Sequence, residues 1–487
     1  MLEELKKEAN KTVTLNGAVA FKSTGTHCLD LFSSIGAMRL VDKSKIFSSF
    51  LLAYTEDPDL ATKILFFARD IREGLGEREI FRTIIKGLTF HHPETVRKNL
   101  QNIPEFGRFD DLLCLMDTPC EEDTLTLLKT KFDEDMQKLR TDGNVSLLGK
   151  WLPSINTSNK EARAKGRKIA KFFGLTLKDY RLALVALRKQ IKIVENYMRE
   201  RDYSFNYSNV PSKAMSKYRN AFLLNDKERF QAFLESVERG EVKINTSTLL
   251  PCDLVHKVVD NHPLTEGEKK TLNVLWKKLP SIDDDSNTLA VIDTSASMTW
   301  SLNSTKPIDV AISLGLFFAE HNKGKFANHY IEFSESPCLV EIKGKDFVSK
   351  VEYICSKCVC ENTNIEAVFD LVLNTAIKNK MKQKNLPKRL IFISDMQFDS
   401  CTNDASLTNF ENAKQNFENA GYKLPEIVFW NVNSITSQQP VTQNEQGVVL
   451  VSGYTPKLFG MVSQNIINPT VFMLDVLSSE RYKAIVA

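Results

Sequence analysis

Five residues of the C-terminal half carry the oxygen atoms that hard divalent cations prefer. The apolar run LAVI is followed directly by Asp293, and Ser295 and Ser297 come next at alternate positions. A second apolar run, LIFIS, is followed by Asp395, and Thr363 stands just before a predicted helix. Two carboxylates and three hydroxyls are a suitable ligand set for Mg²⁺, or for Mn²⁺ or another hard divalent cation. The sequence therefore predicts a metal site at Asp293, Ser295, Ser297, Thr363 and Asp395.

Two other interpretations of these residues are weaker. Asp293 and the serines could cap the following helix, but a helix cap requires neither Thr363 nor Asp395. A phosphatase of the D-x-D-x-T kind needs a second carboxylate two residues after the first, where this chain has Ser295. We expect the ion to keep an open coordination position that favours an acidic group from a partner.

The elements around these residues predict the sheet that would position them. Beyond the acidic and polar stretch at residues 281–287, apolar strands alternate with helical segments, among them TLAVID, PIDVAISLGLFFAEHN, KRLIFISD and PEIVFWNVN. This alternation predicts a mostly parallel, doubly wound α/β sheet with helices on both faces over residues 286–487. In such sheets the ligand crevice lies at the carboxyl ends of the strands, which is where Asp293 and Asp395 fall.

Residues 1–285 have helical periodicity instead. Segments such as SKIFSSFLLAYTE, DLATKILFFARDI and REIFRTIIKGLTFHH carry apolar residues at i, i+3 and i+4, separated by Asp-Pro, Gly-x-Gly or His-Pro breaks. Short helices joined by short turns suggest stacked helix pairs of the HEAT kind, although no strict repeat is visible. We therefore expect an α plus α/β protein with a helical module at 1–285 and an α/β domain at 286–487.

The small net charge of +3 hides a basic segment. Residues 151–230 contain 18 Lys plus Arg against 7 Asp plus Glu, together with aromatic side chains that could stack on unpaired bases. YRLALVALRKQIKIVENYMRER is predicted to form one helix, with apolar residues on one face and cations on another. The alternative is that these cations only solvate a helix or pair with acids such as Glu195. The candidate RNA-binding residues are Arg163, Lys165, Arg167, Lys168, Arg181, Arg188, Lys192 and Arg199.

The segment FARDIREGLGERE alternates basic and acidic residues at high density. An anion site is one interpretation, but the stronger one is that its charges neutralise one another across a helix, glycine turn and helix. Residues that would pair in this way are Arg69, Asp70, Arg72, Glu73, Glu77 and Arg78.

Composition sets the expected location of the protein. The N-terminal segment has no apolar core typical of a signal peptide, and no run approaches 18 uninterrupted apolar residues. Nine scattered cysteines fit a reducing compartment better than a disulfide framework. We expect a cytoplasmic protein with no membrane contact.

Several motifs together resemble one known family. The pattern Asp-x-Ser-x-Ser, then Thr, then Asp is similar to the metal-ion-dependent adhesion site of von Willebrand factor A domains. STGTHCLDLFSSIGAMR, FFARDIREGLGEREIFR, IPEFGRFDDLL, GKWLPSINTS and VPSKAMSKY look like the helical module of the TROVE and Ro-autoantigen superfamily, in particular its uncharacterised branch, where SDMQFD and PEIVFWNVN recur. The resemblance covers nearly the whole chain.

This resemblance implies a ring or horseshoe of HEAT-like helix pairs closed by a von Willebrand factor A domain. It also implies a ribonucleoprotein component that binds structured or misfolded small RNA, and we expect the chain to be a monomer without catalytic activity. An enzyme is disfavoured because no nucleophile, base and orienting group can be assembled from the sequence. The alternative is a protein-interaction scaffold whose metal site binds an acidic residue of a protein partner, with no RNA role.

Overall fold

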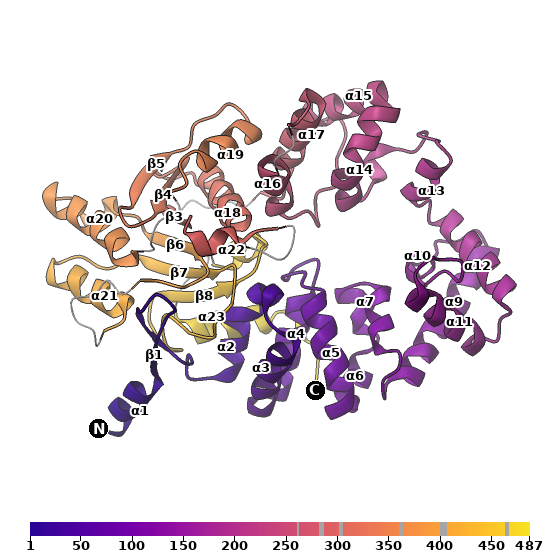
Figure 1. Cartoon of the computed structure of the whole chain (residues 1–487), viewed down its shortest axis with the longest axis horizontal. Coiled ribbons are helices and arrows are strands. Elements are labelled where there is room, and N and C mark those ends of the chain that lie inside the picture. The colour runs from indigo at the N-terminus through magenta and orange to yellow at the C-terminus, as the bar shows by residue number, and fades with distance from the viewer. Residues whose placement is uncertain (261–262, 282–286, 301–304, 360–363, 400–406, 463–466) are drawn as a thin grey trace.

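The helices of the N-terminal region, from α2 (His27–Ser34) to α17 (Glu266–Lys277), form an arc that begins and ends beside a β-sheet (Figure 1). The computed structural model describes residues 1–487 except 261–262, 282–286, 301–304, 360–363, 400–406 and 463–466. Over the described residues, a helical N-terminal region precedes a C-terminal mixed sheet of six strands. The predicted boundary between residues 285 and 286 lies outside the described residues.

The arc consists of short helices, many of which pack against their neighbours along the chain. The helices predicted from periodicity in the first hundred residues are confirmed, since α3, α4, α5 and α6 occupy those segments. In chain order the helices are α2 (His27–Ser34), η1 (Ile35–Leu40), α3 (Lys43–Glu56), α4 (Pro58–Arg69), α5 (Glu79–His91), α6 (Pro93–Asn99), α7 (Asn102–Phe106), α8 (Phe109–Leu112), α9 (Glu121–Arg140), α10 (Leu148–Trp151), α11 (Lys160–Phe172), α12 (Leu177–Gln190), α13 (Val194–Arg199), α14 (Ser212–Asn225), α15 (Lys227–Glu238), α16 (Pro251–Val259) and α17 (Glu266–Lys277).

Local sequence explains where these helices begin. At α4 the Asp57 side chain accepts a hydrogen bond from the Leu60 backbone N–H at 2.9 Å, and Pro58 occupies the first turn, where its missing N–H costs nothing. The apolar face of α4 is fully buried, including Leu65 and Phe66. None of the described helices is both long enough and apolar enough to span a membrane.

The sheet has the strand order β5-β4-β3-β6-β7-β8. Its strands are β3 (Thr288–Asp293), β4 (His329–Phe333), β5 (Cys338–Glu341), β6 (Arg389–Ser394), β7 (Glu426–Asn431) and β8 (Val448–Ser452). All neighbours pair in parallel except β4 and β5. The antiparallel edge strand β5 follows β4 after a four-residue turn and was not among the predicted strands. The prediction of a mostly parallel sheet is therefore confirmed, with β5 making it mixed.

Helices cover both faces of this sheet, as the alternation of strands and helices predicts. In β3 the side chains of Leu289 and Val291 join the apolar cluster on one face, and Ala290 and Ile292 join the cluster on the other. The first cluster includes residues of α20 (Ile365–Lys378) and α21 (Asn409–Asn419), and the second includes α18 (Pro307–His321) and α23 (Pro469–Leu477). Because both faces are buried, the central strands β3 and β6 are apolar over residues 289–292 and 390–393.

The apolar cluster that contains α18 also continues into the helical region. It includes residues of α2, α16 and α17, and α16 packs directly against α18 and α19 (Phe347–Cys355). At the other end of the arc, α2 and η1 pack against β8, and the Gly36 N–H donates to Ser452 Oγ at 3.0 Å. A side chain at Gly36 would clash, since an added Cβ would lie 2.5 Å from the Ser452 carbonyl oxygen. Both ends of the arc are thus fixed to the sheet.

The terminal segments complete the arrangement. The N-terminal helix α1 (Leu2–Asn10) is followed by a hairpin, β1 (Lys11–Val13) and β2 (Val19–Phe21), whose Thr14 Oγ1 donates to the Phe398 carbonyl at 2.6 Å. At the other end, Arg481 forms an ion pair with Asp70 at 2.8 Å, and the ring of Tyr482 packs against Phe67 and Phe106. Sequence-distant segments therefore share one core.

Candidate metal centre

The carboxyl ends of the neighbouring strands β3 and β6 carry the two predicted carboxylates. Asp293 is the last residue of β3, and Asp395 directly follows the last residue of β6. The two strands pair in parallel with Ile292 opposite Ile393, so the two acids lie next to each other at one edge of the sheet. Both side chains are almost completely buried, with 0% and 2% exposure.

Hydrogen bonds tie the predicted hydroxyls to these acids. The Ser295 N–H donates to Asp293 Oδ1 at 2.9 Å, and the hydroxyl oxygens of Ser295 and Ser297 lie 3.1 Å apart. The hydroxyl of Ser394 donates to Asp293 Oδ2. The Ser297 side chain in turn forms a hydrogen bond with Asp395, so four of the five predicted ligands form one connected group. The fifth, Thr363, lies outside the described residues.

The two buried acids, Asp293 and Asp395, have the electrostatic environment of a cation site. Burial, and next the negative charge of Asp395, raise the pKa of Asp293 to about 7, and burial also raises the pKa of Asp395. Asp395 Oδ2 is buried, and no donor among the described residues forms a hydrogen bond with it. Two buried carboxylates side by side cost free energy unless a proton or cation offsets their charge. The residues present therefore fit a divalent cation bound by oxygen ligands.

One further residue at the acids was not predicted as part of the site. Ser394 is the polar residue that ends β6 just before Asp395. Its hydroxyl also accepts a hydrogen bond from the Met396 N–H at 3.0 Å, which holds the loop after β6. In this loop Met396 has a positive φ of 63°, a conformation that turns the chain sharply after Asp395.

The basic segment departs from its prediction in one respect. The prediction of a single helix from Tyr180 onward is wrong, because α12 ends at Gln190 and α13 begins only at Val194. Lys192 lies between them with φ of 54°, so the chain leaves the helical path there. The apolar periodicity continues across the break because residues on both sides pack into the same core, and periodicity alone cannot reveal it.

The eight candidate RNA-binding cations fall into two groups. Lys165 pairs with Glu161, Lys168 pairs with Asp117 and Glu121, and Arg199 pairs with Glu200. The guanidinium of Arg188 donates to the Gly149 and Leu152 carbonyls and to the Ser154 hydroxyl, all within 2.8 Å. Within the described part of the chain, no ion pair or side-chain hydrogen bond is formed by the other four, Arg163, Arg167, Arg181 and Lys192.

The prediction that the charges of FARDIREGLGERE neutralise one another is wrong for most of them. Their partners lie on other elements. Arg69 pairs with Asp111, Asp70 with Arg481, Arg72 with Glu105, and Glu77 with Arg39, while Arg78 alone pairs within the segment, with Glu79. Most charges of this segment therefore form ion pairs with residues of other elements, and these pairs connect the segment to its neighbours in the fold.

Comparison with known proteins places the chain in a family. Residues 14–130 and 157–285, slightly more than half of the chain, match the family described as Domain of unknown function (DUF2828). The chain belongs to this DUF2828 family. Residues 287–468 of this DUF2828 protein also match a second description, Domain of unknown function (DUF7788), and all five predicted metal ligands lie in that part.

Two similar proteins span nearly the whole DUF2828 chain. Uncharacterized protein L728 of Acanthamoeba polyphaga mimivirus is 28% identical over 507 residues, which cover 96% of this chain and 87% of that protein. The crystal structure of the Deinococcus radiodurans Ro (RSR) protein is similar at a TM-score of 0.49 with 11% identity, and the match covers 95% of this chain and all of that one.

Proposed function

We propose that this protein is a non-catalytic RNA-binding protein that also holds a Mg²⁺-class ion for contact with a ligand or partner. The observation that carries the metal site is the pair of buried carboxylates, Asp293 and Asp395, with a raised pKa and an unsatisfied oxygen between strand ends. Asp293, Ser295, Ser297, Thr363 and Asp395 would hold the ion, and a bound ion supplies a positive charge that a ligand oxygen can occupy.

The RNA part of the proposal is supported by the cations of residues 160–192 that the fold does not use. Arg167, Arg181 and Lys192 are exposed, and together with Arg163 they form no ion pair within the described part of the chain. Cations of this kind can contact phosphate groups, whereas the guanidinium of Arg188 is hydrogen-bonded to backbone carbonyls at α10. The resemblance of the helical motifs to the Ro superfamily favours the same function.

RNA binding is tested by removing only the uncommitted cations. In the variant Arg163→Gln/Arg167→Gln/Arg181→Gln/Lys192→Gln, affinity for a small structured RNA should fall for all sequences. The slope of log affinity against log salt should shrink by about 0.7 to 0.9 for each phosphate that the variant no longer neutralises. Gel-shift titrations at three salt concentrations measure both quantities.

The control removes the same charge from another surface. Lys378, Lys382, Lys384 and Lys423 are exposed residues far along the chain, near the amino ends of the strands. Replacing all four with Gln should leave affinity and slope close to those of the wild type. Equal losses of affinity in both variants would show that only the net charge matters. No loss of affinity in either variant would exclude Arg163, Arg167, Arg181 and Lys192 from RNA binding.

A second candidate is a protein-interaction scaffold, favoured by the internal engagement of Arg188, Lys165 and Lys168. In that case the metal ion would bind an acidic side chain of a protein partner. Such binding depends on the divalent ion and only weakly on salt, whereas RNA binding through several phosphates weakens steeply with salt.

A further inference from the structure

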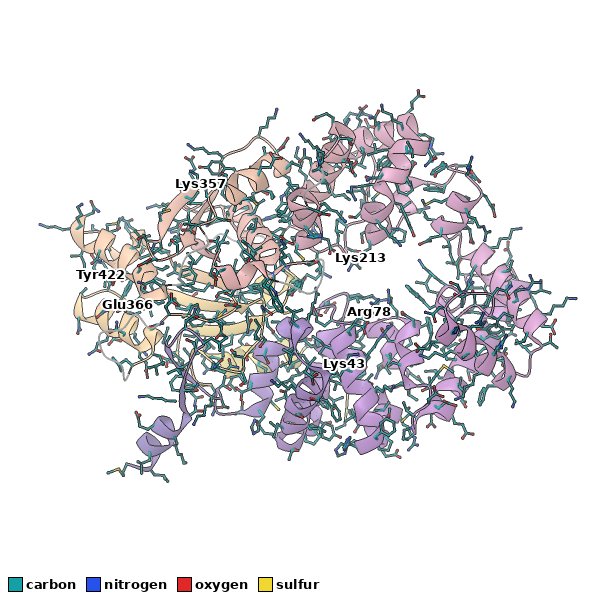
Figure 2. All side chains as sticks on the ribbon, in the orientation of Figure 1. Lys43, Arg78, Lys213, Lys357, Glu366 and Tyr422 are labelled. Carbon is teal, nitrogen blue, oxygen red and sulfur yellow. The ribbon has the colours of Figure 1, made fainter. Side chains whose placement is uncertain are left out.

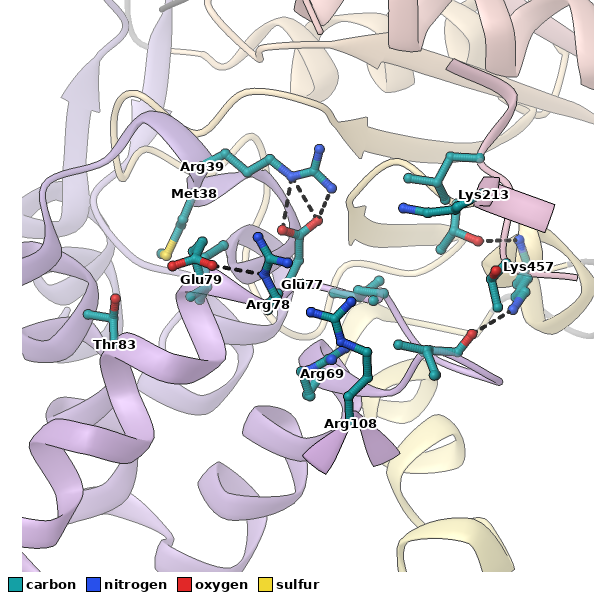
Figure 3. Close-up of a pocket in the computed structure, with 18 of the residues that line it drawn as sticks. Met38, Arg39, Arg69, Glu77, Arg78, Glu79, Thr83, Arg108, Lys213 and Lys457 are labelled. Atoms are coloured by element: carbon teal, nitrogen blue, oxygen red, sulfur yellow. Dashed lines mark hydrogen bonds and ion pairs between the residues drawn. The ribbon is translucent and has the colours of Figure 1, made fainter. Parts of the chain in front are cut away.

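A pocket of about 630 Å³ lies where the two ends of the arc approach each other beside the sheet. One wall comes from η1, α3 and the turn between α4 and α5, and the opposite wall from the start of α14 and the segment before α16. Thr455 and Lys457, which follow β8, line it as well. Figure 3 shows Arg39, Arg69, Arg78, Arg108, Lys213 and Lys457 around this volume. Its size is typical of small-molecule sites.

The lining of this pocket is strongly basic. Of its described lining residues, seven are Lys or Arg and two are Glu, namely Arg39, Lys43, Arg69, Arg78, Arg108, Lys213 and Lys457 against Glu77 and Glu79. Glu77 is occupied by Arg39, with Arg39 Nη2 2.6 Å from Glu77 Oε1, and Glu79 lies 2.9 Å from Arg78. Arg69 and Arg108 pair with Asp111 and Asp110 outside the lining, so the excess positive charge of the pocket rests on its three lysines, Lys43, Lys213 and Lys457.

Three of the lysines have no close acidic partner. No carboxylate in the described residues lies within ion-pair distance of Lys43, and the only acid near Lys213 is Asp253 at 3.9 Å. Lys457 donates instead to the Ile71 and Arg72 carbonyls, and burial lowers its pKa. Figure 2 shows Lys213 and Arg78 on opposite sides of the inner part of the arc. The ammonium groups of Lys43 and Lys213 are available to an anion that enters the pocket, whereas Lys457 is held by two backbone carbonyls.

Helix geometry adds further positive charge at the same place. Lys43 is the first residue of α3, Lys213 the second of α14, and Lys457 the first of α22 (Lys457–Val462), while α5 begins directly after Arg78. Unpaired N–H groups give each helix start a partial positive charge, so a cation placed there is locally unfavourable. Lysines also begin α11 and α15 away from the pocket, so a helix start does not by itself mark a site, but the starts of α5 and α14, which have no side-chain cap among the described residues, add partial positive charge beside Arg78 and Lys213.

Arg108 places a buried hydrogen-bond donor at the same pocket. Its guanidinium stacks on the Trp151 ring with 4.1 Å between the guanidinium carbon and the ring centroid, and one nitrogen donates to Asp110 at 2.8 Å. Its Nε is buried, and no acceptor among the described residues forms a hydrogen bond with it. A buried, unpaired donor of a charged group costs free energy that an incoming oxygen would recover.

We propose that this pocket binds a compact ligand with two or more adjacent phosphate groups, either a free nucleotide di- or triphosphate or an inorganic polyphosphate. The cations surround one volume and do not form a track along the surface, which suits clustered phosphates better than a nucleic-acid backbone. Phosphate oxygens match both Arg and Lys donors and the helix starts. The pocket uses none of the cations proposed above for RNA, so this inference does not depend on that function.

Calorimetric titration in metal-free buffer tests the pocket directly, because the metal site then cannot bind phosphate through an ion. Sodium tripolyphosphate and ATP are the two probes. Wild-type protein should bind tripolyphosphate, and Lys43→Gln/Lys213→Gln should weaken this binding about tenfold or more. Equal affinity for both probes assigns bare polyphosphate as the ligand, and tighter binding of ATP assigns a nucleotide.

The control is Lys160→Gln/Lys227→Gln, which removes two exposed lysines from the first positions of α11 and α15, away from the pocket. It should bind tripolyphosphate like the wild type, and both variants should unfold at or above the wild-type temperature. The proposal is overturned if wild-type protein does not bind tripolyphosphate, or if the two double variants lose affinity equally. It is also overturned if an RNA oligonucleotide without terminal phosphates binds the pocket while tripolyphosphate does not.

Discussion

The candidate metal centre and the basic pocket gather opposite charges in different ways. At the ends of β3 and β6, two carboxylates are buried next to each other, whereas the pocket beside β8 is lined by Lys43 and Lys213, whose side chains are exposed. The acids come from the ends of two neighbouring strands, and the cations come from helices and turns spread over more than 400 residues. A net charge of +3 thus conceals one acidic and one basic cluster.

The largest expected effect separates the two sites. Asp293→Ala should lower the affinity for Mn²⁺ by about 100-fold or more, because it removes a direct ligand and not merely a supporting group. Its binding of tripolyphosphate in metal-free buffer should stay unchanged. Calorimetry measures both, with Asp475→Ala, which removes an exposed carboxylate of α23, as the control. Unaltered Mn²⁺ affinity in Asp293→Ala would disprove the site.

The acidic site should also make the stability of the metal-free protein depend on pH. The pKa of Asp293 rises from its ordinary value of 3.8 to about 7 on folding, so the folded state holds a proton that the unfolded state has lost. This stabilisation is complete below about pH 4 and is lost as the pH rises toward 7, by an amount on the order of 3 kcal/mol. Urea unfolding of metal-free protein at pH 5 and pH 7.5 measures it.

Asp293→Asn is the matching control for this pH dependence, since an amide does not titrate. It should reduce the fall in stability between pH 5 and pH 7.5, and saturating Mg²⁺ should restore the stability of wild-type protein at pH 7.5. If the wild type and Asp293→Asn lose the same free energy of unfolding, other groups cause the effect.

The placement of the two acids and the serines was predictable because its signals are local. Each acid ends an apolar strand, and parallel strands bring their carboxyl ends to one edge, so Asp293 and Asp395 could be placed together from the strand pattern. The serines follow Asp293 at fixed spacing. Ser394 could have been found from the same reasoning, since it is the polar residue at the end of a buried strand.

The pocket was not predictable because its residues share no local pattern. The partners of Asp70 and Glu77 are Arg481 and Arg39, which only the closure of the arc brings near. Periodicity identified the helices but not the break at Lys192, where the apolar stripe continues while the backbone turns. Lysines at the starts of α3 and α14 did not single out the pocket, because Lys160 and Lys227 begin α11 and α15 elsewhere.

A smaller effect should distinguish cations that hold the fold from those that face a ligand. Arg188→Gln removes hydrogen bonds to the Gly149 and Leu152 carbonyls and should lower the free energy of unfolding by about 2 kcal/mol. Arg181→Gln, on the exposed side of the same helix, should change it by less than about 0.5 kcal/mol. Chemical denaturation compares the two. Equal stability of both variants would mean that the α10 turn does not depend on Arg188.

The smallest expected effect concerns the pocket lysines themselves. Lys43→Gln removes a positive charge from the start of α3 and should raise the free energy of unfolding by roughly 0.3 to 1 kcal/mol. Lys378→Gln, at the last position of α20, should lower it slightly, because a cation there is favourable. Thermal unfolding at low salt detects both changes, and a loss of stability in Lys43→Gln would argue that this lysine serves the fold.

The hydrogen bond between Gly36 and Ser452 links residues 416 positions apart in the chain. During translation at about 5 to 20 residues per second, the first helices would therefore wait roughly 20 to 80 s for β8 to emerge. Over that interval the face of α2 that packs against β8 lacks this partner, while Phe32 of α2 already has the ring of Phe67 in α4 to stack on. A chain in which such distant segments pair should fold slowly and rely on chaperones to shield its leading helices while the ribosome completes the sheet.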